Sequence, residues 1–242
     1  RATAPVVAFI DDDAEAAADW LSHLVEPFDE PDVVAVGGAI EAIWPSHRPP
    51  WFPHEFDWVV GCTYRGMPER RAEVRNPIGA NMAFRRACLV AIGGFDPTVG
   101  RIGTRTQGCE ETAAAIRVRA LDPGYRVVFE PGAAVRHHVA IGRTSWRYFI
   151  RRCFSEGISK AQVARLTSSS VALETERTYV RRVLPQGVRA SLNEAVRKRR
   201  PGMANSAFAI VVGLVITGGG YLTGMLNPRE QQLHQPIQLS ID

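Results

Sequence analysis

The sequence predicts an α/β fold, because strand-like and helix-like segments alternate along the chain and because the first predicted strand is followed directly by acidic residues. The apolar run Val6 to Ile10 stops at three aspartates, Asp11, Asp12 and Asp13. Such a run indicates a buried strand that delivers carboxylates to the rim of a sheet, where open α/β folds bind their ligands. Further strands are predicted at Val33 to Ile40, Tyr125 to Glu130 and Ala133 to Val139, and helices at Ala14 to Val25, Arg85 to Ile92, Thr112 to Ala120 and Ser145 to Leu166.

Residue types at particular positions support these elements, which are taken here in chain order. The loop from Trp44 to Phe56 is rich in proline and aromatic residues, which predicts a packed loop facing substrate or membrane. Gly93-Gly94 is a fitting C-terminal stop for the helix before it. The alanines between Thr112 and Ala120 favour helix, Pro131-Gly132 predicts a turn between the two later strands, and Gly157 predicts an interruption of the last helix.

The composition is that of a globular protein with an appendage. The chain has 242 residues, of which 45% are hydrophobic and 22% charged, with a net charge of +4. Because it begins at Arg1 and its first strand follows at once, we expect an N-terminal part of the domain to be missing. The four cysteines show no CxxC spacing, which argues against a zinc knuckle or a disulfide framework and fits a reducing compartment.

The C-terminal third predicts contact with a membrane. Residues 206–226 form an uncharged stretch of bilayer-spanning length, although five glycines leave a packed or re-entrant hairpin as the alternative. Arginines crowd the region before it, which by the positive-inside rule places the main domain in the cytoplasm. These arginines lack interleaved aromatic residues, so nucleic acid is not expected as a partner. We expect a catalytic domain at 1–166, a basic amphipathic linker at 167–205, a transmembrane segment at 206–226 and a polar tail at 227–242.

The three aspartates indicate a metal site. Three like charges at one strand end require a cation, and hard oxygen ligands suit Mg²⁺ or Mn²⁺ with positions left open for substrate phosphates. The alternative is a helix N-terminus, with Asp13 as the cap and the acidic charges favoured by the helix dipole.

Six motifs occur in a recognisable order: FIDDDA, NPIGANMAFRR, GGFD, GCEET, YRVVFEPGAAVRHHV and RRCFSEGISKA. Over about Val6 to Ala164 the chain resembles the family-2 inverting glycosyltransferases from their DxD motif onward. The resemblance implies a nucleotide-diphospho-sugar transferase (GT-A-like) fold, a mixed sheet flanked by helices. The last motif is most similar to that of enzymes acting on dolichyl- or polyprenyl-phosphate-linked sugars, including glucuronosyltransferase-like members.

The resemblance also implies roles for the acidic residues. Asp11 and Asp13 are the outer pair of the DxD motif and would hold the metal, with Asp12 close behind. The acceptor hydroxyl must lose a proton, which calls for a carboxylate base. Glu111 is the candidate, but because the family shows Glu-Asp where this chain has Glu110-Glu111, either glutamate remains open as the base. Both could instead only stabilise the start of the following helix.

Further residues are placed by the same resemblance. His137, at a strand end, would contact the metal or the diphosphate in preference to His138, although a histidine there can also be a surface residue. Basic groups would meet the leaving diphosphate, unless they lie on a solvated helical face, and a loop of small residues would allow close approach of the substrate. The basic groups are Arg151, Arg152 and Lys160. The loop of small residues consists of Gly79, Ala80 and Asn81.

Together these features predict a metal-assisted, inverting transferase that moves a hexosyl or glucuronosyl group from a nucleotide-diphosphate sugar to a hydroxyl of a lipid-linked or cell-envelope glycan acceptor at the cell membrane. Two alternatives stay open. A Mg-dependent phosphohydrolase also uses Asp-x-Asp after a strand, but it gives no account of the GCEET and RCFSEG motifs. A membrane-anchored, non-catalytic nucleotide-sugar-binding module would result if the missing N-terminal part is absent in the cell.

Overall fold

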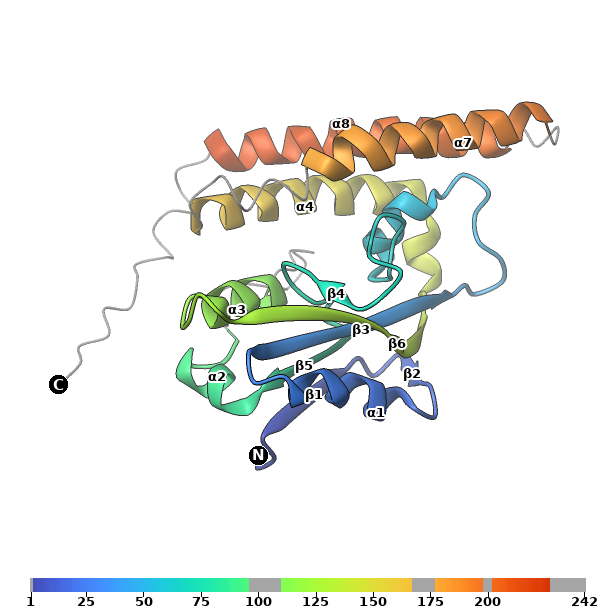
Figure 1. Ribbon diagram of the computed structural model, residues 1–242. Helices are drawn as coiled ribbons and strands as arrows, with labels where there is room; N and C mark the ends of the chain where they lie inside the picture. The colour runs from blue at the N-terminus through green and yellow to red at the C-terminus, as the bar shows by residue number, and fades with distance from the viewer. Residues whose placement is uncertain (1, 96–109, 167–176, 198–201, 227–242) are drawn as a thin grey trace.

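The computed structural model describes residues 2–95, 110–166, 177–197 and 202–226. Its centre is a six-stranded mixed sheet with the order β1-β5-β3-β6-β2, and β4 also pairs with β6. The long central strands β3 and β6 run parallel, and all other pairs are antiparallel. The mixed sheet flanked by helices is therefore confirmed (Figure 1). The strands are β1 (Val6–Ile10), β2 (Ala14–Ala16), β3 (Val33–Ile43), β4 (Ala72–Glu73), β5 (Asn81–Arg85) and β6 (Arg126–His138).

Helices cover both faces of the sheet. Because successive residues of a strand point to opposite sides, the central strand β3 contributes side chains to two separate cores. On one side, Val34 packs in a core with side chains of α2 (Arg86–Ala91) and α3 (Glu110–Arg119). On the other, Val33 packs with α1 (Trp20–Val25) and the short helix η1 (Glu26–Asp29). This burial on both faces explains why β3 is apolar almost without interruption.

A layer of three long helices lies beside the sheet and is separated from it by the helix η2 (His54–Val60), as Figure 1 shows. These helices are α4 (Trp146–Leu166), which follows the short η3 (Ile141–Thr144), α7 (Leu184–Arg197), which continues from the π-helical turn η4 (Tyr179–Val183), and α8 (Gly202–Leu226). The predicted packing of the proline-rich loop is confirmed. Trp51 stacks on Trp146 of α4 with ring centroids 4.2 Å apart, and Phe52 lies in the same core.

Helices α4 and α8 touch through glycines. A Cβ atom on Gly157 would lie 2.1 Å from the carbonyl oxygen of Thr217, and one on Gly220 would lie 2.1 Å from the carbonyl oxygen of Phe154. Because neither position has room for a side chain, the two backbones are in direct contact. The predicted interruption of α4 at Gly157 is wrong for this reason: the glycine serves helix packing, and α4 runs unbroken.

Two other expectations are corrected, and one alternative is excluded. The predicted helix from Ala14 begins only at Trp20, because Ala14–Ala16 pairs with β6. Pro131-Gly132 makes no turn: β6 continues through it, with a register irregularity against β3 and with the Gly132 N–H donating to the Glu130 carboxylate. Residues 206–226 belong to one continuous helix, which excludes the hairpin. Four predicted segments lie partly or wholly outside the described residues: the last residue of the GGFD motif, the start of the GCEET motif, part of the linker, and the polar tail.

Candidate active site

The sheet brings three potential metal ligands together at one strand end. Asp11 follows β1, Asp13 precedes β2, and pairing of Ala14 with His137 sets β2 beside β6. Ligand atoms of Asp11, Asp13 and His137 all lie within 4.8 Å of one another. Asp12 is exposed and does not belong to this cluster. The structure therefore groups the outer aspartates with the histidine of the distant strand β6.

The chemistry of this cluster suits a hard divalent cation. His137 is buried, with its Nε2 3.1 Å from an Asp13 carboxylate oxygen and its Nδ1 3.8 Å from the Cys62 sulfur. Burial lowers the pKa of His137, against the opposing effect of Asp13, so the imidazole is held in the neutral form that binds metals. Two carboxylates and a neutral imidazole fit Mg²⁺ or Mn²⁺. His138, by contrast, pairs with Glu15 at the surface.

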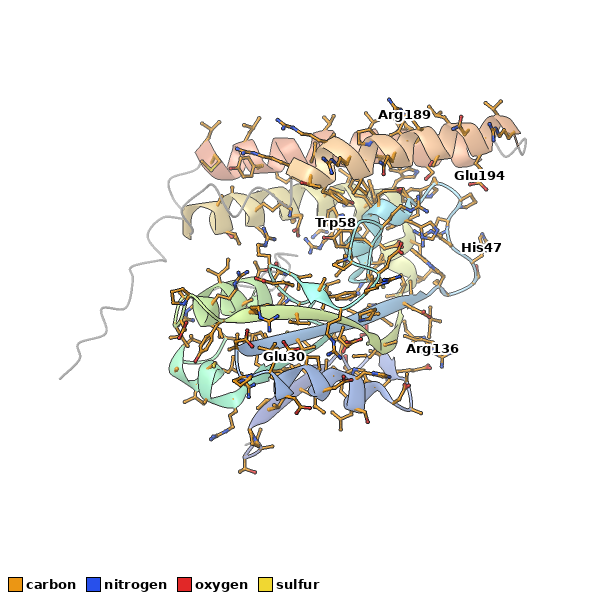
Figure 2. All side chains as sticks on the ribbon, viewed as in Figure 1. Glu30, His47, Trp58, Arg136, Arg189 and Glu194 are labelled. Atoms are coloured by element: carbon orange, nitrogen blue, oxygen red, sulfur yellow. The ribbon has the colours of Figure 1, made fainter. Side chains whose placement is uncertain are left out.

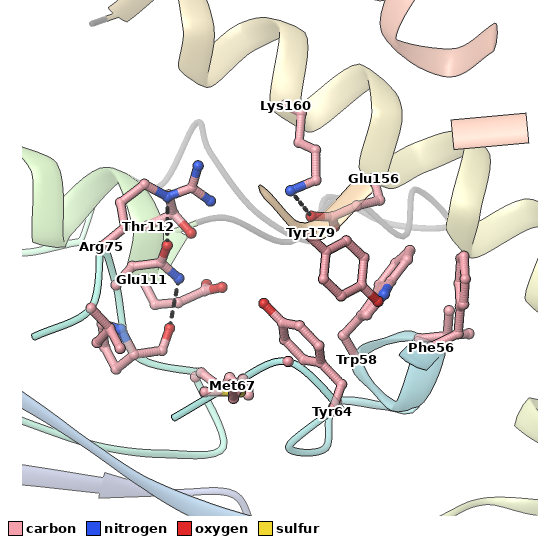
Figure 3. A pocket seen from close by; sticks show the side chains of 18 of the residues that line it. Phe56, Trp58, Tyr64, Met67, Arg75, Glu111, Thr112, Glu156, Lys160 and Tyr179 are labelled. Carbon is pink, nitrogen blue, oxygen red and sulfur yellow. Dashed lines mark hydrogen bonds and ion pairs between the residues drawn. The ribbon is translucent and has the colours of Figure 1, made fainter. Parts of the chain in front are cut away.

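A cavity of about 1680 Å³ opens at this end of the sheet (Figure 3). Its lining includes Asp11 and His137, the turn before β5, the start of α3, the inner side of α4, η4 and part of α8. The cavity therefore joins the metal-binding cluster to the helical layer. The predicted residues that line it are Asp11, Gly79, Ala80, Glu110, Glu111, His137, Arg152 and Lys160.

The two glutamates stand in the first turn of α3. Burial raises the pKa of Glu111 to about 7, and the charges of Glu110 and Glu156 add to this effect while Arg152 opposes it. A Cβ atom on Gly79 would lie 3.9 Å from the Glu111 carboxylate, so the two residues are neighbours in the cavity lining. Glu110 has one buried carboxylate oxygen that lacks a hydrogen-bond partner within the described residues. A carboxylate that titrates near neutrality is suited to general base catalysis.

Helix α4 forms a basic wall opposite Glu111 (Figure 3). Glu156 lies 2.9 Å from the Arg152 guanidinium and 3.7 Å from the Lys160 ammonium. Burial opposes its ionisation, but these two cations lower the pKa of Glu156 overall. Arg152 also lies over the Trp58 ring. Arg151, one residue away, is exposed and does not line the cavity, so the structure separates it from the predicted phosphate contacts.

The environment of Asn81 differs from the one expected for a residue that contacts substrate. Its side chain is fully buried, donates to the carbonyl oxygens of Ala39 and Ala133 at 2.9 and 2.7 Å, and accepts from the Trp20 indole at 2.8 Å. It does not line the cavity. We therefore correct its role to a structural one that ties β3, β5, β6 and α1 together.

Replacing Asn81 by Leu should destabilise the fold, because it leaves buried carbonyl groups without donors at about 1–3 kcal/mol each. The measurement is the urea midpoint of the variant at an unchanged m-value. Asn193→Leu, at an exposed position on α7, is the matched control and should shift stability by less than about 0.5 kcal/mol. An Asn81→Leu variant as stable as the wild type would contradict the structural role.

Several cavity residues were not predicted from the sequence. Glu156 stands inside the RCFSEGISKA motif, so the motif itself was a signal for it. Trp58 and Tyr64 follow the proline-rich loop, whose aromatic content was the available hint. Tyr179 and Arg75 had no signal, because only the tertiary fold brings η4 and the turn before β5 to the cavity.

Comparisons with known proteins show what the chain is similar to. Residues 1–93 match the family described as glycosyl transferase family 2. The chain is 35% identical over 227 residues to a glucosyl-dolichyl phosphate glucuronosyltransferase of Haloferax volcanii, which covers 93% of this chain and 72% of the relative.

A solved structure also resembles the chain: the mannosyltransferase PcManGT from Pyrobaculum calidifontis, in complex with GDP-Man and Mn²⁺. The TM-score is 0.50 at 17% identity, over 89% of this chain and 63% of that chain, so this chain spans less than two thirds of the solved protein. At that identity the likeness concerns the fold alone, which is the nucleotide-sugar transferase fold. The family match and the curated relative show that the chain belongs to glycosyltransferase family 2.

Proposed function

We propose that this protein transfers a glycosyl group, a glucuronosyl or hexosyl unit, from a nucleotide-diphosphate sugar to a hydroxyl of a lipid-linked glycan, with inversion at the anomeric carbon. The observation that carries the proposal is that the Asp11 and His137 side chains and the Glu111 carboxylate line one cavity. That cavity therefore offers a site for a charged leaving group and a base for an incoming hydroxyl.

The base is assigned to Glu111. In the transfer, the acceptor oxygen bonds to the anomeric carbon as the bond from that carbon to the diphosphate breaks, and the electron pair leaves with the diphosphate. The acceptor proton passes to the Glu111 carboxylate. A pKa of about 7 makes this carboxylate basic enough to take the proton and still largely ionised above neutrality. Attack from the face opposite the leaving group gives inversion.

Asp11, Asp13 and His137 would hold the divalent ion, Mg²⁺ or Mn²⁺. When bound, the ion neutralises negative charge on the leaving diphosphate. Arg152 and Lys160 add positive charge to the same cavity, and Glu156 holds both cations in place. We assign these two cations to the anionic groups of the substrates, whereas exposed Arg151 has no such role in the proposal.

The lipid-linked acceptor and the membrane location are supported by two findings. The relative's name includes dolichyl phosphate. Ala204–Leu226 is long and apolar enough to cross a membrane, with a mean hydropathy of 1.8. We place the catalytic residues on the cytoplasmic side of the cell membrane, because the arginines that precede this helix suit the anionic surface of the cytoplasmic leaflet. Since η4 and α8 line the cavity, we also extend the catalytic unit beyond residue 166 through α8.

The deciding experiment is a transfer assay with the purified chain, Mn²⁺ or Mg²⁺, a set of nucleotide-diphosphate sugars that includes UDP-glucuronic acid, and glucosyl-phosphoprenol of defined chain length. We expect a product extended by one sugar, with the anomeric configuration opposite to that of the donor by NMR. A retained configuration would contradict the inverting mechanism. Release of phosphate without any transfer product would favour the phosphohydrolase.

A further inference from the structure

Helix α8 has two dissimilar faces. One face is fixed to α4 by the glycine contacts described above, and a Cβ atom on Gly224 would likewise lie 2.8 Å from the Ala161 Cβ. Helix α4 in turn directs Arg152, Glu156 and Lys160 into the cavity. Because the backbones of α4 and α8 are in direct contact, α8 cannot enter a bilayer across its full width without taking charged residues of α4 with it.

The opposite face of α8 is exposed and apolar. We name it the outer stripe: Phe208, Val211, Val215, Leu222 and Leu226, which are 61, 49, 65, 63 and 81% exposed. Their spacing of three, four, seven and four residues keeps them on one side of an α-helix, about half a turn from the glycines that face α4. Residues 204–226 include no Asp, Glu, Lys or Arg.

The neighbouring helix adds positive charge on the same side of the layer. In Figure 2, Arg189 of α7 points away from the sheet. Leu192 and Val196 follow it by three and seven residues and are 47 and 79% exposed, so they share its helical face. Arg197 at the end of α7 and Arg182 in η4 are exposed as well, whereas Arg181 lines the cavity. An apolar stripe beside arginines is the pattern of a helix that lies in the interface of an anionic leaflet.

We propose that the outer stripe and the adjoining face of α7 rest on the anionic surface of a membrane, with α8 lying in the plane of the interface instead of crossing the bilayer. A charged side chain at the bilayer centre is strongly unfavourable, and a crossing α8 would carry Arg152, Glu156 and Lys160 of α4 with it. Burial of the outer stripe to headgroup depth requires none of them to leave water.

This arrangement deepens the proposed function and rests on it in one respect, the lipid-linked acceptor. Between its two faces, α8 turns Leu214, Gly218 and Tyr221 toward the cavity. The cavity therefore adjoins the lipid-facing side of the molecule, and an acceptor anchored in the leaflet would reach Glu111 from that side.

The test measures depth along α8 on vesicles of phosphatidylcholine with phosphatidylglycerol. One new cysteine at a time replaces Phe208, Val215 or Leu222 in the full chain, with Cys109 changed to Ser and the buried cysteines 62, 88 and 153 retained. Each new cysteine carries an environment-sensitive fluorophore that is quenched by lipids brominated at known depths. The outer positions are 14 residues apart, about 21 Å along the helix axis. Equal depths at all three, about 5–10 Å below the headgroups, support the proposal. A central label far deeper than the outer two would show a crossing helix and overturn it.

Charge substitution gives a second measurement. Val215→Glu should weaken binding to the anionic vesicles at least about tenfold, whereas Leu121→Glu, at an exposed apolar position after α3, should leave binding unchanged. Wild-type binding should also weaken when phosphatidylglycerol is omitted or salt is raised. Absence of binding by the wild type, or a dimer in solution that Val215→Glu dissociates, would overturn the proposal. Neither measurement needs a donor sugar, so an inactive protein that binds vesicles would count against the proposed function alone.

Discussion

Replacing Glu111 by Gln should lower turnover by about 10²–10⁴-fold with the affinity for the donor retained, because the amide cannot accept the acceptor proton. Single-turnover kinetics with the lipid-linked acceptor measures the first quantity, and calorimetry with the nucleotide sugar and Mn²⁺ measures the second. Glu110→Gln is the matched control, since it removes the neighbouring charge from the same helix turn. If Glu110→Gln shows the full loss and Glu111→Gln does not, the base is the preceding residue.

The pH profile gives an independent check of the same residue. Because the base works only when ionised, kcat/KM should rise with pH and level off above about 7, the value to which burial raises the Glu111 pKa. Glu110 and Glu156 hold this pKa up and Arg152 holds it down, so Glu110→Gln should shift the rise to lower pH. A rise centred near the ordinary carboxylate pKa of about 4.3 would contradict a buried base.

Asp13→Asn should abolish metal-dependent binding of the donor while the protein stays folded. Asp13 contributes a carboxylate to the cluster with Asp11 and His137, and an amide oxygen is a weaker ligand for a hard dication. Calorimetry of the nucleotide sugar with and without Mn²⁺ is the measurement. We expect the wild type to lose most of its affinity when EDTA is added, and the variant to bind equally weakly in both conditions.

Asp12→Asn separates this prediction from a general effect of negative charge, because Asp12 is adjacent but lies outside the cluster. Its donor affinity should stay within a few fold of the wild type. Equal losses for Asp12→Asn and Asp13→Asn would show that the acidic run acts through its summed charge. Far-UV circular dichroism of each variant confirms that the fold is intact.

Much of the sheet could be predicted because its signals are local. The apolar run before Asp11 and the strand from Val33 are readable from a few residues each, and both are confirmed. The strand Ala14–Ala16 could not be read, because only its pairing with β6, a partner about 120 residues away, makes it a strand. Pro131 and Gly132 are turn residues by local rules, yet they lie inside β6, at the irregularity where the register against β3 passes from the pair Gly38 and Glu130 to the pair Ile40 and Val135.

The site was predictable to the extent that motifs mark it. The order of motifs indicated Asp11, Asp13, His137 and Glu111, and the structure sets the first three together and the fourth in the same cavity. Asn81 was misread because a buried asparagine that satisfies backbone carbonyl groups looks, in sequence, like one that meets a substrate. The cavity wall from η4 and α8 depends on packing between distant helices, for which the sequence carries no local mark.

The three sides of α8 have a kinetic consequence if the protein rests on the leaflet as proposed. One side of the helix fixes it to α4, a second side lines the cavity, and a third is the outer stripe. An enzyme held flat on the leaflet that contains its acceptor meets that acceptor by diffusion in two dimensions. Its rate then depends on the mole fraction of acceptor in the lipid and not on the amount per volume of buffer. Adding inert phospholipid would slow the reaction even when every molecule of enzyme and acceptor remains in the tube.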